Sequence, residues 1–226
     1  MTFLELCNML AQEGAAAGSG LTAVTGQVGE YKRIVSWIAR ADEDVQRLSN
    51  SWLFMRSGFT VNTVADTAAY AYGSCTDTTT SVAITAFRNW INDSFKCYLQ
   101  SSGIGGEAEL SFLDYDDWYR HYGTGVQNSG QPAEFTILAN RSFSLGPKPN
   151  AVYVVSGEYQ KAVTTMTASS DTPVYPSEYH MLAVYRAMMS FGRFTGATEV
   201  YQDGKNNYLS MLSEMERTQL PEICLP

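Results

Sequence analysis

The order of its hydrophobic periodicities is the feature that most constrains the fold of this chain. Apolar residues recur at helical spacing near both ends of the 226-residue sequence, whereas the long middle block alternates as half-buried strands do. A chain of this length can hold a core domain with an inserted subdomain. The sequence therefore predicts an α+β fold, in which N- and C-terminal helices form one bundle and carry an inserted antiparallel β-sandwich or barrel-like module.

Residues 1–53 form the predicted N-terminal helical part, which starts with a capping box. Thr2 and Glu5 stand three residues apart, so each side chain can accept a hydrogen bond from the other residue's backbone N–H. Gly14 is expected to end this first helix. One apolar stripe runs along it at helical spacing, formed by Phe3, Leu6, Cys7 and Leu10.

A longer helix is predicted from about Val28 to Leu48. Its apolar face alternates steps of three and four residues through Tyr31, Ile34, Ile38, Ala41, Val45 and Leu48. Asp42, Glu43 and Asp44 lie away from that stripe. We therefore expect these three carboxylates to form a solvated face.

Residues 54–174 form the predicted β-rich insertion. The strand candidates are 59–64, 82–84, 94–99, 108–112, 132–138, 142–145 and 151–155. One short helix is expected among them, over Tyr115–Tyr122. Short strands at such intervals are typical of an antiparallel sandwich or a small barrel.

Helical patterning returns in residues 175–218, the predicted C-terminal part of the same bundle. Ser177 is expected to act as an N-cap. Residues 181–194 are apolar on nearly every side, which predicts a central, buried helix whose narrow polar stripe is Arg186, Ser190 and Arg193. Thr198 is expected to cap the last helix. The remaining residues, 219–226, contain prolines that forbid a helix and are predicted to form an extended apolar tail.

The composition favours a protein that works through subunit contacts. Charged residues make up 17% of the chain, against roughly a quarter in ordinary globular proteins. Much of the polar surface must come from neutral groups, including 14 tyrosines, which are favoured at interfaces. The net charge of −8 argues against binding to the nucleic-acid backbone. We find no apolar segment long enough to cross a bilayer and no visible secretion signal.

The sequence offers no recognisable catalytic set. Its two histidines, His121 and His180, do not stand at ligand spacing from a Cys or Glu. Residues 103–108 loosely match a dinucleotide-binding glycine loop but lack its strand–loop–helix context, so a hairpin turn is predicted. A calcium-like run opens at Asp114, but Trp118 occupies a ligand position. The cysteines are expected to be free thiols, at Cys7, Cys75, Cys97 and Cys224. We expect no enzymatic activity, no cofactor and no metal.

Several short motifs follow one another in a characteristic order. They are Gly130-Gln131-Pro132, Phe135, Leu145-Gly146-Pro147-Lys148-Pro149, Tyr153, Tyr159, Asp171-Thr172-Pro173 and Pro176, followed by Tyr179-His180. Flanked by terminal helices, this order resembles head-to-tail adaptor (connector) proteins of tailed bacteriophages, the group that includes the tail tubular protein A type. The segments 2–6 and 52–56 resemble members of the same group. The similarity covers essentially the whole chain, as scattered positions.

The resemblance implies a structural virion protein at the head–tail junction, made in the host cytoplasm. Such adaptors form homo-oligomeric rings, commonly dodecamers, that dock beneath the portal protein and seat the next tail or nozzle protein. Genomic DNA passes through the ring without sequence recognition. Adaptors of this kind often extend their C-termini onto the portal, so the predicted portal-binding residues are Leu220, Pro221, Ile223 and Leu225. The alternative for that segment is packing on its own helices.

Other functions fit parts of the sequence. Another neck or tail-completion protein would share the same layout. A carbohydrate- or receptor-binding β module is suggested by Trp90, Trp118 and the many tyrosines, although apolar terminal helices speak against it. An unrecognised hydrolase is a more distant alternative.

Overall fold

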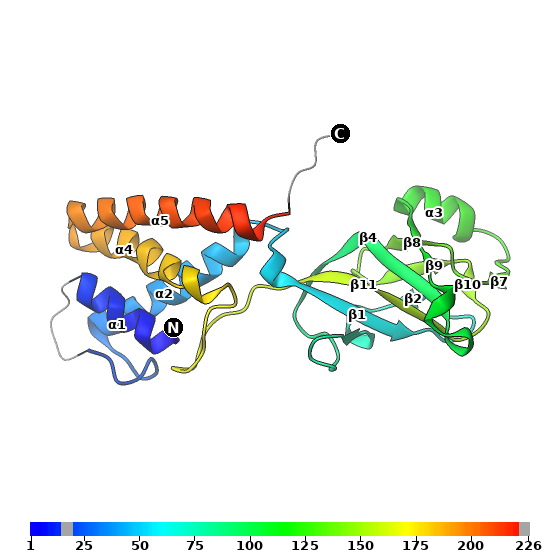
Figure 1. Cartoon of the computed structure of the whole chain (residues 1–226), viewed down its shortest axis with the longest axis horizontal. Helices are drawn as coiled ribbons and strands as arrows, with labels where there is room; N and C mark the ends of the chain where they lie inside the picture. The colour runs from blue at the N-terminus through cyan, green and yellow to red at the C-terminus, as the bar shows by residue number, and fades with distance from the viewer. Residues whose placement is uncertain (15–19, 222–226) are drawn as a thin grey trace. The chain divides into compact units, whose positions relative to one another are not determined.

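A computed structural model describes residues 1–14 and 20–221 of the chain (Figure 1). Its contacts divide the chain into two compact units. The helical unit consists of Met1–Met55 with Val163–Pro226, and the β unit consists of Arg56–Ala162. The predicted α+β class is therefore confirmed, as is a helical bundle to which both ends of the chain contribute.

Over its described residues, the helical unit contains four α-helices and two short 3-10 helices. These are α1 (Phe3–Glu13), α2 (Gly29–Arg47), η1 (Leu53–Met55), η5 (Ser177–Tyr179), α4 (Met181–Thr195) and α5 (Thr198–Gln219). The capping box of α1 is confirmed, because Thr2 Oγ1 accepts from the N–H of Glu5 while the Glu5 carboxylate accepts from the N–H of Thr2. Gly14 is the C-cap of that helix, as expected.

Two caps differ from the expectation. α4 begins at Met181 with His180 in the cap position, whereas Ser177 opens the preceding 3-10 turn. α5 begins at Thr198 itself, with Ala197 in the cap position. In both places the chain turns tightly into the helix, so a backbone turn supplies the helix start where a hydroxyl cap was predicted.

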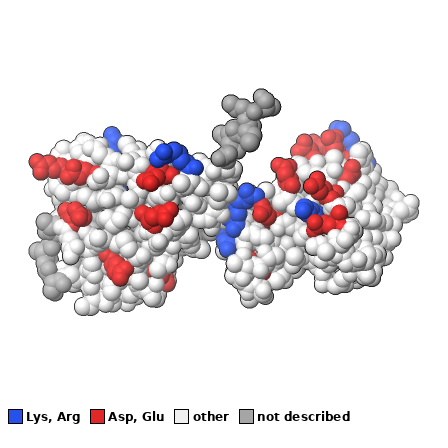
Figure 2. Space-filling view, in the orientation of Figure 1, with Lys and Arg blue, Asp and Glu red and all other residues white. Residues whose placement is uncertain are grey.

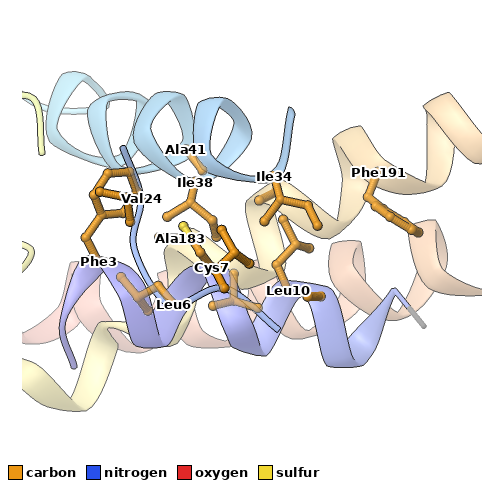
Figure 3. Packing of buried hydrophobic residues seen from close by; sticks show 14 of the residues in the cluster. Phe3, Leu6, Cys7, Leu10, Val24, Ile34, Ile38, Ala41, Ala183 and Phe191 are labelled. Atoms are coloured by element: carbon orange, nitrogen blue, oxygen red, sulfur yellow. The ribbon is translucent and has the colours of Figure 1, made fainter. Parts of the chain in front are cut away.

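One apolar core joins α1, α2 and α4 (Figure 3). The stripe of α1 meets Ile34, Ile38 and Ala41 of α2, and Ala183 and Phe191 of α4 belong to the same cluster. The side chains of Ile34 and Ile38 are fully buried. Burying such a side chain contributes about 1.5–3 kcal/mol to the stability of the fold. The residues at the predicted helical spacing are therefore the ones through which the helices pack against each other.

Helix α4 is the central helix of the unit, since it packs against α1, α2 and α5. Two glycines bring α4 and α5 close together. A Cβ atom on Gly192 would come within 2.8 Å of the Tyr201 backbone nitrogen, and one on Gly204 within 2.9 Å of the Tyr185 carbonyl oxygen. Larger residues at either position would force the two helices apart.

A second apolar cluster closes the other end of the helical unit. It contains Val45, Trp52, Met55, Tyr175, Tyr179, Leu182, Tyr208 and Met215. The indole N–H of Trp52 donates to the carbonyl oxygen of Val45 over 3.1 Å. Trp52 thereby fixes the chain where it leaves α2 and turns toward the β unit.

The β unit contains two larger sheets and one short pair of strands. The five-stranded sheet has the order β3 (Thr76–Asp77), β1 (Arg56–Asn62), β11 (Tyr153–Lys161), β4 (Phe87–Leu99), β5 (Ala108–Glu109). The four-stranded sheet has the order β2 (Ala69–Tyr70), β9 (Phe143–Gly146), β8 (Glu134–Ile137), β6 (Ser111–Phe112). The pair is β10 (Lys148–Pro149) with β7 (Ser129–Gly130). Pairing is antiparallel except for β10–β7 and β6–β8.

Aromatic side chains from both larger sheets fill the space between them, so the β unit is a sandwich. The rings of Phe95 on β4 and Phe135 on β8 stack with centroids 4.1 Å apart. The ring centroids of Phe59 on β1 and Phe143 on β9 lie 6.0 Å apart. The four rings are almost completely buried. The predicted β module therefore has a single aromatic core shared by its two sheets.

Several strand boundaries differ from the prediction. Residues 82–84 form one isolated bridge, Thr76 to Ala83, rather than a strand. The predicted strand 108–112 is broken at Leu110, where the chain crosses from the five-stranded to the four-stranded sheet. β4 begins at Phe87, well before the predicted start, because residues 87–91 already pair with β11. The short helix α3 (Tyr115–Tyr122) is confirmed.

Candidate assembly surfaces

The predicted portal-binding segment is divided by the boundary of the described residues. Leu220 follows α5 in an extended conformation and packs partly against the second apolar cluster of the helical unit. Pro221 is exposed. Ile223 and Leu225 lie outside the described residues. The structure therefore places Leu220 on its own helices, while the role of the segment in binding the portal stays a prediction.

A groove of about 450 Å³ lies between α2 and α4 of the helical unit. Its lining consists of Trp37, Arg40, Ala41, Glu43, Asp44, Arg47, Arg186 and Ser190. An ion pair of 2.9 Å between Arg186 and Asp44 joins α4 to α2, and another of 2.7 Å joins Arg47 to Glu43 along α2. These pairs hold two guanidinium groups in fixed positions, whereas Arg40 is exposed beside them.

The arginines of this groove belong to a longer basic surface. Arg33, Arg40 and Arg47 of α2 are spaced by seven residues, as are Arg186 and Arg193 of α4. Seven residues make about two helical turns, so each set lies along one face of its helix. We call these five residues the arginine face; they are a third of the chain's 15 basic residues.

Aromatic rings extend the arginine face at its far end. The Arg33 guanidinium lies 4.1 Å from the centre of the Phe194 ring, and that of Arg193 lies 5.5 Å from the centre of Tyr201. Trp37 contacts Phe194, with ring centres 5.7 Å apart. Arginine combined with Trp, Tyr and Phe is the composition of protein–protein interfaces.

The arginine face was only half visible in the sequence. Arg186, Ser190 and Arg193 stand out as the polar stripe of an otherwise apolar helix. The arginines of α2 do not stand out, because that helix carries charges on most of its exposed positions. Their seven-residue spacing was the available signal, but it becomes a surface only when α2 packs beside α4.

Helix α5 presents a different surface. Gly204, Tyr208 and Met215 form its buried side. The opposite side is exposed and carries Glu199, Asp203, Asn206, Ser210, Ser213, Glu214 and Arg217, which we call the outer face of α5. In Figure 2 the visible faces of both units show more Asp and Glu than Lys and Arg. The arginine face is thus a basic surface on a largely acidic unit, as far as the described residues show.

Helix α3 forms an exposed aromatic surface on the β unit. Tyr115 and Tyr119 are 50% and 48% exposed, and their rings stack with centres 6.0 Å apart. Tyr122 anchors the helix, because its hydroxyl donates to the Glu134 carboxylate of β8 over 2.8 Å. Asp116 and Asp117 lie in the first turn of α3, where a helix dipole favours negative charge. α3 is therefore a second surface suited to contact with another protein.

The expectation of a solvated acidic face at residues 42–44 is wrong for Asp42, which is 1% exposed. Asp42 accepts from the side-chain amide of Gln46 over 2.7 Å. Gln46 in turn donates to the carbonyl oxygen of Thr164 and accepts from its N–H, each over 2.9 Å. Burial raises the pKa of Asp42 to about 6, and the hydrogen bond from Gln46 only partly offsets that effect. This polar group holds the segment that returns from the β unit against α2.

A second buried carboxylate, Asp77, organises one edge of the β unit. It accepts from the hydroxyls of Tyr159 at 2.6 Å and Ser57 at 2.8 Å. The backbone N–H groups of Thr79 and Thr80 donate to it over 2.7 and 2.8 Å. Burial alone would raise the pKa of Asp77, but these four hydrogen bonds lower it well below its usual range. Asp77 thus fixes the 77–81 loop onto strands β1 and β11.

The remaining candidate groups have structural roles. Trp90 is buried in the sandwich core and donates to the Arg141 carbonyl oxygen over 2.8 Å, so it cannot act as an exposed platform for a sugar. His180 is buried beside the Tyr175 carbonyl oxygen, and burial lowers its pKa. Residues 100–106 connect the antiparallel strands β4 and β5, which confirms the predicted hairpin.

The cysteines and acidic residues add no reactive centre to these surfaces. Cys7, Cys75 and Cys97 are free and buried, and burial raises the pKa of the Cys7 thiol to about 12. Cys224 lies outside the described residues. Within residues 1–14 and 20–221, no cluster of three His, Cys, Asp or Glu side chains is arranged to hold a metal ion. Among the same residues, each helix is too short or too polar to cross a lipid bilayer.

Comparison with known proteins agrees with surfaces built for assembly. No curated protein matches the chain. The family described as SU10 adaptor protein matches residues 1–222, which include the whole β unit and nearly all of the helical unit. The chain therefore belongs to the SU10 adaptor protein family and is a bacteriophage adaptor, a structural component of the virion at the head–tail junction.

Proposed function

We propose that this adaptor assembles into a closed ring that docks beneath the portal protein, joins the capsid to the tail and lets the genome pass through its channel. The observation that supports this function most strongly is the family match over residues 1–222, because it covers both units. A ring of twelve copies, with a downstream tail or nozzle protein on its other side, is the expected arrangement. The resemblance of this chain to the tail tubular protein A type of adaptor also stays a prediction.

The surfaces of the protein support a ring. A subunit in a head-to-tail ring needs two different patches, one for each neighbour. The arginine face and the outer face of α5 differ in charge, and the exposed tyrosines of α3 offer a further contact. Many neutral polar groups and few charges suit surfaces that become buried on assembly.

Electron microscopy of virions and of the purified chain mixed with portal protein tests the ring. We expect closed rings of this chain at the portal vertex, in a fixed number of copies. Copies found elsewhere in the tail would favour the alternative of another neck or tail-completion protein. Chains that stay monomeric in the presence of portal protein would contradict the proposed function.

We expect the C-terminal segment to bind the portal. Because Leu220 packs on the helical unit, removal of residues 222–226 should leave α5 intact while it removes Ile223 and Leu225. The truncated chain should bind tailless, portal-bearing capsids at least tenfold more weakly, with an unchanged melting temperature. Replacement of residues 222–226 by five Gly/Ser residues is the matched control for chain length and should bind equally weakly. Binding of both variants to these capsids as tightly as the wild type would contradict this proposal.

The net charge of −8 leads us to propose an acidic channel. Like-charge repulsion would keep DNA from adhering to the channel wall. The charge of the residues that line the channel of an assembled ring tests this point. A basic lining would contradict it.

A further inference from the structure

We propose that the outer face of α5 of one copy lies in the groove between α2 and α4 of the next copy, where its carboxylates meet the arginine face. This inference rests on the proposed ring, and it names the surfaces through which neighbouring copies contact each other. Five guanidinium groups and two carboxylates, Glu43 and Asp44, make the surface around the groove basic. The helical unit as a whole is acidic, so another copy supplies complementary charge.

The two surfaces match in length. From Arg33 to Arg47 the basic stripe of α2 extends over 14 residues, or about 21 Å at the helical rise of about 1.5 Å per residue. On α5, Glu199, Asp203 and Glu214 lie within about 60° of one another around the helix axis, at about 100° per residue. They span 15 residues, or about 22 Å. A helix laid along the groove can therefore place a carboxylate near each end of the arginine stripe.

The two surfaces also lie on different sides of one helical unit, as a head-to-tail contact requires. Met188 of α4 faces Gly204 of α5, since a Cβ on that glycine would lie 2.8 Å from the Met188 Cβ. Ser190 lines the groove on the side of α2. Two residues along a helix project about 200° apart, so the groove and α5 lie on nearly opposite sides of α4. The outer face of α5 points away from α4 again.

The groove is better suited to a helix than to a single carboxylate. Its ion pairs, Arg186 with Asp44 and Arg47 with Glu43, already satisfy part of the guanidinium groups. The sides of the arginine side chains that face solvent remain available to bind carboxylates of a partner. Trp37 also lines the groove between the two helices. Exposed charge pairs contribute little individually, but a row of them fixes register and orientation, and excludes partners with the wrong charge.

Charge reversal in both surfaces tests the inference with the full-length chain. The groove variant carries Arg40→Glu and Arg193→Glu, and the helix variant carries Asp203→Arg and Glu214→Arg. Each alone should self-associate at least tenfold more weakly in analytical ultracentrifugation and leave at least tenfold fewer copies on tailless capsids. Lys32→Glu with Arg141→Glu, at exposed sites outside the groove and outside α3, makes the same charge change as the groove variant and should assemble as the wild type does.

An equimolar mixture of the groove and helix variants should recover assembly. Each acidic groove then meets a basic helix and each basic groove meets an acidic helix, so alternating rings can close. Recovery also shows that both variants are folded. If the wild type assembles while both variants assemble equally well, this inference fails and the ring stands. If the wild type itself stays monomeric on capsids, the ring and this inference fail together. Loss of DNA binding without loss of self-association would assign the arginine face to nucleic acid and overturn the proposal.

Discussion

Replacing Asp77 by alanine should destabilise the β unit by about 3–5 kcal/mol, because a buried hydrogen-bonded charge would disappear and leave its donors unpaired. The four donors that lose their acceptor are the Tyr159 and Ser57 hydroxyls and the N–H groups of Thr79 and Thr80. Urea unfolding followed by peptide-resolved hydrogen exchange reads the two units separately. Protection should fall in β1, β3 and β11 and stay unchanged in the helical unit.

Two further variants separate the charge of Asp77 from its shape. Asp77→Asn keeps one acceptor oxygen for the loop N–H groups and should cost less than Asp77→Ala. Asp93→Ala removes an exposed carboxylate of β4 and should change stability by no more than about 0.5 kcal/mol. Equal losses in Asp77→Ala and Asp93→Ala would show that the hydrogen bonds around Asp77 contribute nothing.

The lowered pKa of Asp77 also sets how the β unit responds to acid. A carboxyl whose folded-state pKa lies below its unfolded value contributes stability that is present above the unfolded pKa, near 4. That contribution is lost as the pH falls through the lower, folded-state pKa. Mild acid near pH 5 should therefore leave the contribution of Asp77 to the β unit intact.

Replacing Asp42 by asparagine should stabilise the helical unit at pH 7.5 by about 2–3 kcal/mol. The pKa of Asp42 is raised to about 6 by burial, so the folded state holds the ionised carboxylate at a cost at neutral pH. Each pH unit between the ordinary and the raised pKa corresponds to about 1.4 kcal/mol. The amide oxygen of asparagine can still accept from Gln46, which keeps the contact to Thr164.

The gain from Asp42→Asn should depend on pH in a defined direction. In the wild type, the favourable contribution of the protonated Asp42 carboxyl to the free energy of unfolding is fully present below the unfolded pKa, near 4. That contribution is lost by the time the pH has risen through the folded-state pKa of about 6. The two proteins should therefore have nearly equal stability at pH 4, diverge as the pH rises from about 4 to about 6, and keep a constant difference up to pH 7.5, in urea titrations read by hydrogen exchange in α2. A gain that is the same at both pH values would contradict a raised pKa.

The sequence predicted the elements whose signals are local. The capping box at Thr2 and Glu5, the apolar stripe of α1 and the buried character of α4 depend on residues within a few turns of one another. The strands around Phe59, Phe135 and Phe143 were visible because aromatic residues alternate with polar ones. These patterns were sufficient for the α+β class and for one bundle built from both chain ends.

What the sequence could not show depends on contacts between distant segments. Asp42 stands in a run of three acidic residues of α2, and it is buried where Gln46 holds Thr164, a residue 118 positions from Gln46, against the helix. Asp77 stands in a polar stretch that reads as a loop, and its hydroxyl donors come from β1 and from β11, 82 residues away. The arginine face likewise requires two helices that lie far apart in the chain. Side chains with long-range partners carry no periodic signal.

The pairing of β1 with β11 has a further consequence. The chain enters the β unit at Arg56 and leaves it just beyond Gln160, and these two residues face each other across one antiparallel ladder. Paired Cα atoms in such a ladder lie about 5 Å apart, and an ion pair between Arg56 and Glu158 adds to the clasp. A short loop in place of the whole β unit could bridge that gap. The sandwich is therefore an insertion that can be exchanged as one piece, which we call a cassette. Evolution can enlarge, trim or swap such a cassette while the packing of the bundle that bears it stays untouched.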